Sequence, residues 1–248
     1  MCGIVGYIGK QNAVPILLDG IKSLEYRGYD SAGIAVLESG IQNKELGIKC
    51  IKAVGRVANL ENKIKDLSLN GALGIAHSRW ATHGGVTEEN AHPHTDCKKN
   101  IWLAHNGIIE NYKELKNDLI KKGHKFNSET DTEVLAHLIE AEAGDSLEER
   151  VRSALKKVKG TYGLAIIDRR EPEKLVAIRN FSPLLLGIGK NEYLVASDAS
   201  AVLRRTRKII YLNDGEMAVL TPEIHNIFTL DNESVHREPE ELEWTLES

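Results

Sequence analysis

A cysteine at position 2 offers the clearest chemistry in this sequence, because removal of Met1 would make it the amino-terminal residue. A terminal cysteine carries both a thiol that can attack a carbonyl carbon and an α-amine that can take the thiol proton. The α-amine titrates near ~8, so it can move protons at neutral pH, and the thiolate is the nucleophile. The mostly apolar stretch 3–8 also fits a buried strand that simply follows a buried cysteine. Position 2 alone therefore leaves a nucleophile and a core residue both open.

Histidines near another cysteine raise a second possibility, metal binding. His83, His92, His94 and Cys97 lie close together in the sequence. Their spacing matches no standard zinc pattern of paired cysteines and paired histidines. We therefore predict no metal site and no cofactor, and stoichiometric zinc found by mass spectrometry in protein never exposed to chelator would contradict this.

The composition narrows the class of protein. Apolar residues make up 42% and charged residues 27%, as in ordinary globular proteins. The net charge of -4 argues against nucleic acid or an anionic membrane as a partner. No apolar run approaches the ~20 residues of a membrane span, no secretion signal is recognisable, and three scattered cysteines make a poor disulfide framework. We expect a cytoplasmic protein.

Apolar periodicity predicts the elements that must position these residues. Strand patterns occur at 2–8, 31–37, 73–78 and 101–105, followed later by 163–167, 175–178, 193–196 and 216–220. Helix patterns occur at 14–24, 57–67, 112–122, 130–143, 146–158 and, briefly, 199–203. The pattern at 130–143 opens with a capping box between Thr130 and Glu133. The strands do not alternate regularly with helices, which favours antiparallel sheets covered by helices over a parallel doubly wound sheet. The unpatterned segment 79–100 is long enough to be a functional loop.

Five segments hold the remaining polar residues of interest: CGI at 2–4, RGYDSAG at 27–33, RWATHG at 79–84, HNG at 105–107 and SETDTE at 128–133. In order and spacing they resemble the class II glutaminase domains of the N-terminal nucleophile superfamily, over nearly the whole chain. Within that family, segment 27–33 is similar to members that aminate fructose 6-phosphate, whereas purine-pathway members tend to carry Gln where Tyr29 stands. The resemblance implies hydrolysis of L-glutamine to glutamate and ammonia. It also implies an α+β fold, a four-layer αββα sandwich of two antiparallel sheets.

The same resemblance implies where the charge of the reaction is stabilised. Attack of Cys2 on the glutamine carboxamide creates an oxyanion, which needs hydrogen-bond donors placed in advance. The implied donors are the side-chain amide of Asn106 and the backbone N–H of Gly107. On the residues alone, Asn-Gly between apolar runs is equally a strong hairpin-turn signal.

A glutamine site is implied beside the nucleophile. Arg79 would bind the α-carboxylate through its planar guanidinium, and Asp131 would bind the α-ammonium. On the residues alone, Asp131 also fits helix capping, because acidic side chains are favoured in a first helical turn. Thr82 and His83 are implied to shape the site. Trp80 is implied as a lid that gates ammonia, and its alternative is a core aromatic at a strand end.

The expected domain organisation is one glutaminase domain over residues 2–236 and an acidic linker over 237–248, leading toward a sugar-phosphate isomerase domain. Such an enzyme would supply ammonia for glucosamine 6-phosphate synthesis from fructose 6-phosphate, as a homodimer when full length. The alternatives are a purine-pathway amidotransferase and a non-catalytic glutamine sensor. Glutamate release by wild-type and Cys2→Ala protein separates enzyme from sensor. A chain that retains Met1 has no free amine on Cys2, and we expect it to be an inactive precursor.

Overall fold

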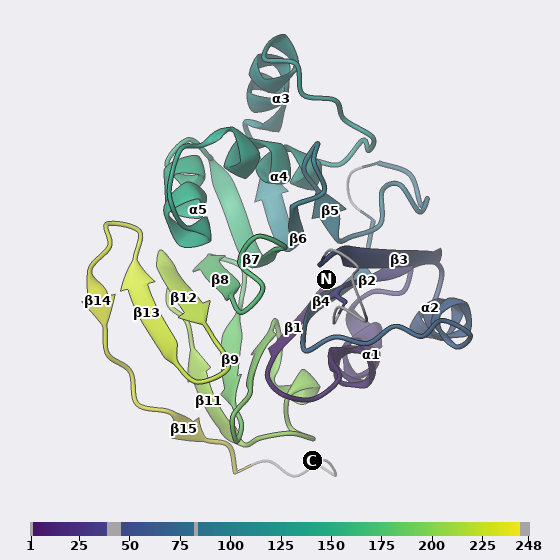
Figure 1. Cartoon of the computed structure of the whole chain (residues 1–248), viewed down its shortest axis with the longest axis vertical. Helices are drawn as coiled ribbons and strands as arrows, with labels where there is room; N and C mark the ends of the chain where they lie inside the picture. Colours follow the sequence, from purple (N-terminus) through teal and green to yellow (C-terminus); the bar gives the residue numbers. More distant parts are fainter. Residues whose placement is uncertain (1, 39–45, 82–83, 244–248) are drawn as a thin grey trace.

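The computed structural model describes residues 2–38, 46–81 and 84–243. Met1, Thr82 and His83 therefore lie outside the described residues, as do 39–45 and 244–248. Within the described part, two antiparallel sheets lie face to face at the centre of the molecule, with helices on both outer sides (Figure 1).

One sheet contains eight of the described strands. These are β1 (Gly3–Ile8), β2 (Ser31–Leu37), β3 (Ile48–Val54), β4 (Leu73–Arg79), β9 (Leu185–Ile188), β10 (Tyr193–Ala196), β11 (Lys208–Tyr211) and β15 (Glu240–Glu241). Their order across the sheet is β15-β11-β9-β10-β1-β4-β2-β3. The first strand of the chain therefore lies inside the sheet, paired with β10 on one side and β4 on the other.

The other sheet contains seven of the described strands. These are β5 (His94–Thr95), β6 (Ile101–Ile109), β7 (Gly160–Asp168), β8 (Leu175–Asn180), β12 (Glu216–Leu220), β13 (His225–Thr229) and β14 (Ser234–Val235). Their order is β14-β13-β12-β8-β7-β6-β5, and consecutive neighbours pair antiparallel throughout.

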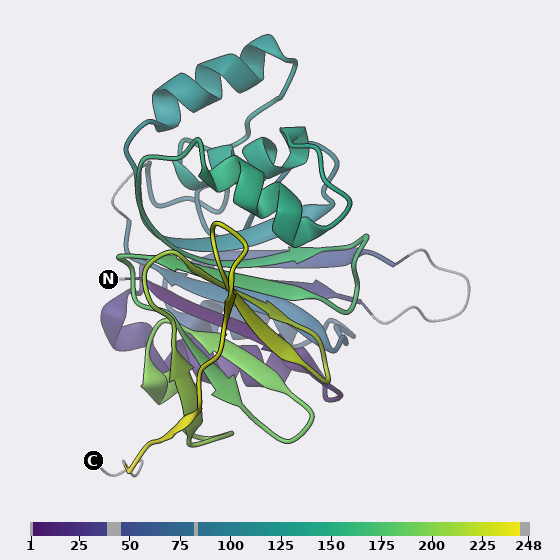
Figure 2. The same ribbon diagram turned by 90° about the vertical axis from the view of Figure 1, so that its left-hand side faces the viewer.

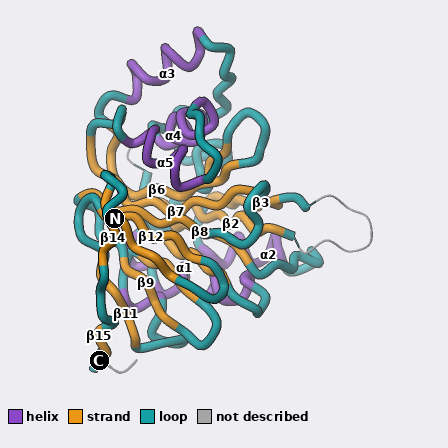
Figure 3. The backbone as a smooth tube through the Cα atoms, turned by 60° about the vertical axis from the view of Figure 1, so that its left-hand side comes forward, coloured by secondary structure: helices purple, strands orange, loops and turns teal. Residues whose placement is uncertain are grey.

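Helices form the two outer layers. Helices α1 (Ala13–Ser23) and α2 (Val57–Ile64) cover the eight-stranded sheet, and α3 (Tyr112–Lys121), α4 (Thr132–Ala141) and α5 (Leu147–Leu155) lie on the side of the seven-stranded sheet. Figure 2 shows α3, α4 and α5 above the strands, and Figure 3 shows the strands stacked between the two helical layers. Two short 3₁₀ turns span Glu25–Arg27 and Ala199–Ala201.

Residue alternation along the strands explains the four layers. In β1, Val5 and Tyr7 pack into the core beneath α1, whereas Ile4 and Ile8 pack between the sheets. In β7, side chains alternate in the same way between the inter-sheet core and the core under α4 and α5. A strand buried on both faces needs apolar residues throughout, which is why these segments are continuous apolar runs. The predicted αββα sandwich of two antiparallel sheets is confirmed.

One predicted detail at the start of α4 is wrong. The sequence predicts a helix from residue 130 with a capping box between Thr130 and Glu133. The helix begins at Thr132, and Glu133 N–H does donate to Thr130 Oγ1 at 3.4 Å. The Glu133 carboxylate instead accepts from the backbone N–H groups of Asn127 and Ser128, at 2.8 and 2.6 Å. The preceding turn therefore takes the carboxylate that a capping box would use.

The carboxy-terminal segment adds to the fold. Glu240 and Glu241 pair with β11 at the edge of the eight-stranded sheet, and Arg237 forms an ion pair with Glu216 at 2.5 Å. The expected boundary between residues 236 and 237 stays a prediction. Among the described helices, none has the length and apolar character needed to cross a bilayer.

Candidate active site

Cys2 immediately precedes β1 and lines a small pocket. Its Sγ accepts a hydrogen bond from the backbone N–H of Trp80 at 3.2 Å. Burial raises the pKa of the Cys2 thiol, and the Trp80 hydrogen bond and the positive charge of Arg79 only partly oppose this shift. The thiol therefore needs a nearby base to react at neutral pH.

The pocket is small and polar. It is lined by residues from five segments of the chain: Cys2, Arg79, Trp80, His92, His105, Gly107, Thr130, Asp131 and Thr132. Its cavity volume of about 30 Å³ holds one or two water molecules.

Asn106 and Gly107 lie inside β6, so the hairpin-turn alternative is wrong. They pair with Gly163 and Tyr162 of β7. Gly107 has a φ of 130°, a value that L side chains rarely adopt, and a Cβ there would lie 2.1 Å from Thr161 O. Only glycine fits this point of close backbone approach.

A buried histidine fixes the Asn106 amide. Asn106 Nδ2 donates to the carbonyl oxygen of Cys2 at 3.0 Å. His77 Nε2 lies 3.0 Å from Asn106 Oδ1 and 3.1 Å from the carbonyl oxygen of His105. Because a carbonyl oxygen can only accept, Nε2 carries the hydrogen, and the amide must turn Oδ1 toward His77 and Nδ2 toward Cys2. Burial lowers the pKa of His77 to about 3, so the ring is neutral.

His77 was not predicted from the sequence. The signal available was a histidine within the otherwise apolar start of strand 73–79, and that signal is weak. Its ring stacks on His92 with centroids 4.2 Å apart, and His92 Nδ1 accepts from the backbone N–H of His105 at 3.3 Å. Burial lowers the pKa of His92 and His105 as well. A neutral, hydrogen-bonded histidine cluster therefore supports the pocket.

The metal grouping considered from the sequence does not assemble. His94 Nε2 contacts Thr130 Oγ1 at 3.0 Å, and the His94 ring lies edge-on to His92, with centroids 4.8 Å apart. Among the described residues, neither histidine shares a possible metal cluster with Cys97, and His83 lies outside the described part.

Arg79 and Asp131 both line the pocket. The Arg79 guanidinium is buried and donates to the carbonyl oxygens of Gly85 and Gly84, at 3.0 and 3.4 Å. Burial lowers the pKa of Arg79, and the negative charges of Asp30 and Asp131 oppose this shift. Asp131 Oδ2 accepts from the backbone N–H of Ile109 at 2.8 Å and makes no capping bond to α4. Asp131 therefore occupies the N-cap position of α4 without a side-chain capping bond, and its negative charge still lies at the helix end that the helix dipole favours.

Segment 27–33 positions the turn that carries Trp80. Asp30 Oδ2 accepts from the N–H of Ala81 at 2.9 Å, and a Cβ at Gly28 would lie 2.9 Å from Trp80 N. The Trp80 side chain is 47% exposed, with its ring edge-on to Tyr29 at 6.0 Å, so it is not a core aromatic. The sequence marks this segment as important but assigns Gly28 and Asp30 no role.

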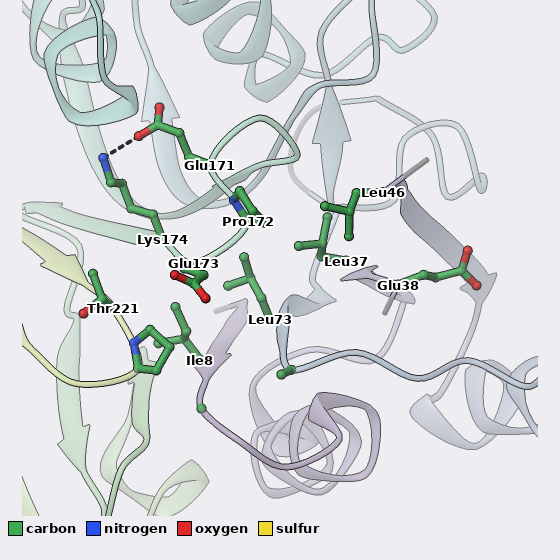
Figure 4. Close-up of a pocket in the computed structure, with 13 residues that line it drawn as sticks. Ile8, Leu37, Glu38, Leu46, Leu73, Glu171, Pro172, Glu173, Lys174 and Thr221 are labelled. Carbon is green, nitrogen blue, oxygen red and sulfur yellow. Dashed lines mark hydrogen bonds and ion pairs between the residues drawn. The ribbon is translucent and has the colours of Figure 1, made fainter. Parts of the chain in front are cut away.

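A larger and more apolar pocket lies at the other end of β1 (Figure 4). It has a volume of about 580 Å³, and Ile8, Leu37, Leu73 and Pro172 are among its walls. The described residues that line it include no cysteine, histidine or serine. Size alone would select this pocket, but its side chains offer no nucleophile comparable to Cys2.

Curated relatives match the whole chain. It is 50% identical over 248 residues to the glutamine--fructose-6-phosphate aminotransferase (isomerizing) of Thermus thermophilus, 49% over 250 residues to that of Thermococcus kodakarensis, and 46% over 254 residues to that of Chlorobaculum tepidum. Each match covers 100% of this chain and 40% of the relative. The chain therefore spans about two fifths of the length of these proteins.

Solved structures agree with the fold. Glutamine phosphoribosylpyrophosphate amidotransferase from B. subtilis superimposes with a TM-score of 0.80 at 26% identity, covering 92% of this chain and 49% of that one. An allosteric regulatory enzyme of purine biosynthesis gives 0.79 at 29% identity, with the same coverage. The profile of the glutamine amidotransferase domain family matches residues 77–204, just over half of the chain. With its sandwich fold and its cysteine pocket, this chain belongs to the glutamine amidotransferase domain family.

Proposed function

We propose that this chain hydrolyses L-glutamine to glutamate and ammonia through a thioester on Cys2. The observation that carries the proposal is the fixed Asn106 amide beside Cys2. Its Nδ2 has two hydrogens, and only one of them is used in the 3.0 Å bond to Cys2 O. The other is available to a negatively charged oxygen that forms next to the nucleophile.

The first step needs the free α-amine of Cys2, and therefore loss of Met1. The thiol proton passes to that amine, and Sγ attacks the carboxamide carbon, so the carbonyl oxygen becomes an oxyanion. Asn106 Nδ2 and Gly107 N–H donate to this oxygen. Because both donors belong to the rigid strand β6, little reorganisation is needed as the charge develops.

The second half releases the products. The α-ammonium returns its proton to the departing nitrogen, the C–N bond breaks, and ammonia is released. A thioester between Cys2 and the glutamyl group remains. Water, deprotonated by the same α-amine, then attacks the thioester carbon, and glutamate leaves with the thiol restored. One residue thus serves as nucleophile, base and acid.

Recognition of the amino-acid end of glutamine falls to Arg79 and Asp131. A guanidinium has five N–H donors, so Arg79 can hold the α-carboxylate while it keeps its backbone bonds. Asp131 attracts the α-ammonium. Thr82, His83 and Trp80 are proposed to complete the site.

The wider function proposed is ammonia supply for the synthesis of glucosamine 6-phosphate from fructose 6-phosphate. The names of the relatives support this function. As further parts of the proposal, the whole enzyme would carry a sugar-phosphate isomerase domain, form a homodimer and work in the cytoplasm. The chain itself corresponds to two fifths of such an enzyme. A purine-pathway role is less well supported, because the phosphoribosylpyrophosphate amidotransferase is only 26% identical.

The test is glutamate release from L-glutamine by wild-type and Cys2→Ala protein, with the mass of each chain measured to establish loss of Met1. We expect Cys2→Ala to lose at least roughly 10³-fold in kcat, as for other nucleophile deletions. A Cys50→Ala control, in a strand far from the pocket in sequence, should keep activity. Equal rates for Cys2→Ala and wild type, or activity in protein that retains Met1, would contradict the mechanism.

A further inference from the structure

Four potential metal ligands converge outside the active-site pocket. Cys97 follows β5, His124 follows α3, and His137 and Glu140 share one face of α4. Their ligand atoms all lie within 4.8 Å of one another. Although the sequence predicts no metal site, we propose that these four side chains bind a structural Zn²⁺ ion.

The distances between the ligand atoms fit a tetrahedral ion. Zinc bonds of 2.0–2.1 Å to nitrogen and 2.3 Å to sulfur give tetrahedral edges of about 3.3 Å between nitrogens and about 3.6 Å between sulfur and nitrogen. The two Nδ1 atoms of His124 and His137 lie 3.3 Å apart, and Cys97 Sγ lies 3.7 and 3.4 Å from them. Glu140 Oε2 lies 3.2 Å from His124 Nδ1 and 3.7 Å from His137 Nδ1. Five of the six edges therefore agree with one zinc-centred tetrahedron, and the sixth, from Cys97 Sγ to a carboxylate oxygen of Glu140, is within 4.8 Å.

The surroundings of His137 favour its Nδ1 atom as the zinc ligand. Its Nε2 lies 3.5 Å from Glu133 Oε1, which places a carboxylate behind the ring, on the side away from the cluster. The other oxygen of Glu133 is held by the N–H and the hydroxyl of Ser128, each at 2.6 Å. A carboxylate placed behind a histidine directs the hydrogen to Nε2, leaves Nδ1 with a free lone pair, and recurs behind zinc-bound histidines.

The chemical types of these four ligands also favour zinc over other ions. A thiolate and two imidazoles suit zinc, whereas magnesium and calcium prefer oxygen ligands. Four protein ligands would complete a tetrahedral shell, as in structural sites, and leave no open position for catalysis. His137 is buried, with a side chain only 1% exposed, whereas Cys97 is exposed and gives the ion a route in.

An ion at this position would join three segments that are far apart in sequence. The Cys97 segment continues into β6, which carries Asn106 and Gly107. Helix α4 carries His137 and follows directly from Asp131. Zinc would therefore brace the two elements that enter the candidate active site, through its own bonds and without contact to the pocket.

The alternative is a metal-free cluster in which protons bridge the same atoms. The full chain, purified without chelator, should contain about one zinc per molecule by mass spectrometry. After removal of zinc, added Co²⁺ should give the visible bands of a tetrahedral ion and a thiolate-to-cobalt charge-transfer band.

Matched variants identify the ligands. Cys97→Ser should lose the charge-transfer band and at least roughly tenfold in Co²⁺ affinity, and His124→Gln should weaken binding similarly. Cys50→Ser should bind as wild type does. Zinc should also raise the Tm of wild type but not of Cys97→Ser. A metal-free chain that binds no Co²⁺ would overturn the proposal, as would a charge-transfer band that survives Cys97→Ser.

Discussion

The two pockets at opposite ends of β1 differ in size and in chemistry. The pocket at Cys2 has a volume of about 30 Å³, and the one beyond Ile8 about 580 Å³. About 20 Å of strand separates them, at roughly 3.3 Å per residue. The smaller pocket holds a thiol, a guanidinium and a carboxylate, whereas apolar side chains and prolines provide much of the wall of the larger one (Figure 4).

The difference shows what makes one of them suited to catalysis. At the Cys2 end, polar atoms are fixed by partners behind them, as His77 fixes the Asn106 amide. Fixed donors stabilise developing charge without reorganising, and this effect is large in a site that excludes water. At the far end, Lys174 already forms an ion pair with Glu148 at 2.7 Å. The larger cavity therefore does not mark the proposed catalytic end, and the fixed polar atoms mark it better.

Apart from Cys2→Ala, Asn106→Ala is expected to have the largest effect among the changes at the polar end. Loss of one oxyanion donor should lower kcat by about 10²–10³-fold, with KM for glutamine little changed. Steady-state rates of glutamate release measure both constants. A large rise in KM at constant kcat would assign Asn106 to substrate binding instead.

Asp131→Asn should act on binding rather than on chemistry. The amide oxygen can still accept from Ile109 N–H, so the fold is retained, but the charge that attracts the α-ammonium is lost. A hydrogen bond to a charged group contributes about 1.5–3 kcal/mol, which corresponds to roughly 10- to 100-fold in KM. Asp145→Asn, at an exposed position before α5, is the matched control. Equal KM values in the two variants would remove Asp131 from the site.

The buried histidine cluster at the polar end predicts that the folded protein loses stability in acid. Burial lowers the pKa of His77 from 6.5 to about 3 and lowers that of His92 in the same direction. The unfolded chain therefore binds more protons between about pH 3 and 6.5, and stability falls as the pH falls through that window.

From pH 7.5 to 5.5, each such histidine should remove about 1.4 kcal/mol from the free energy of unfolding. Denaturant titrations at the two pH values measure the loss. His92→Gln should reduce that loss by about one histidine's share, whatever its effect on stability at pH 7.5. An unchanged pH dependence in His92→Gln would mean that this ring is not held neutral by the fold.

Leu46→Ser tests the apolar end and should have the smallest effect. Leu46 lines the large pocket and is 45% exposed, so its replacement should change the free energy of unfolding by no more than about 0.5 kcal/mol. Glutamate release should stay within about twofold of wild type. A loss comparable to that of Asn106→Ala would show that the two ends of β1 are coupled in catalysis.

The periodicity of the sequence predicts the strongly patterned elements, and physical reasons account for the others. Strand β3 is half-buried and carries Lys49 and Lys52, so its apolar pattern is weak. Strands β9 and β11 are four residues each and give only a weak period, although β10, which is equally short, was predicted. Their place depends on neighbours that are distant in sequence, and local patterns do not encode such neighbours.

The candidate site is likewise divided between residues that the sequence predicts and contacts that only the fold provides. Cys2, Arg79, Asn106, Gly107 and Asp131 were predicted from their segments, and all five surround one pocket or its nucleophile. Their roles stay predictions. The support from His77 depends on the placement of β4 near β6, in the opposite sheet, and the cluster at Cys97 joins residues 27 and 40 positions apart. Contacts of this kind arise only from the packed fold.

The interior position of β1 has a consequence for the start of the chain. Chain ends usually fray, yet this strand pairs with β4 from Gly3 and with β10 from Val5, within three residues of the first described one. Its amide hydrogens should exchange with solvent deuterium as slowly as those of the central core, only through global opening. An affinity tag fused ahead of Cys2 would have to leave from beside the middle of a sheet, so purification handles belong at the other end of the protein.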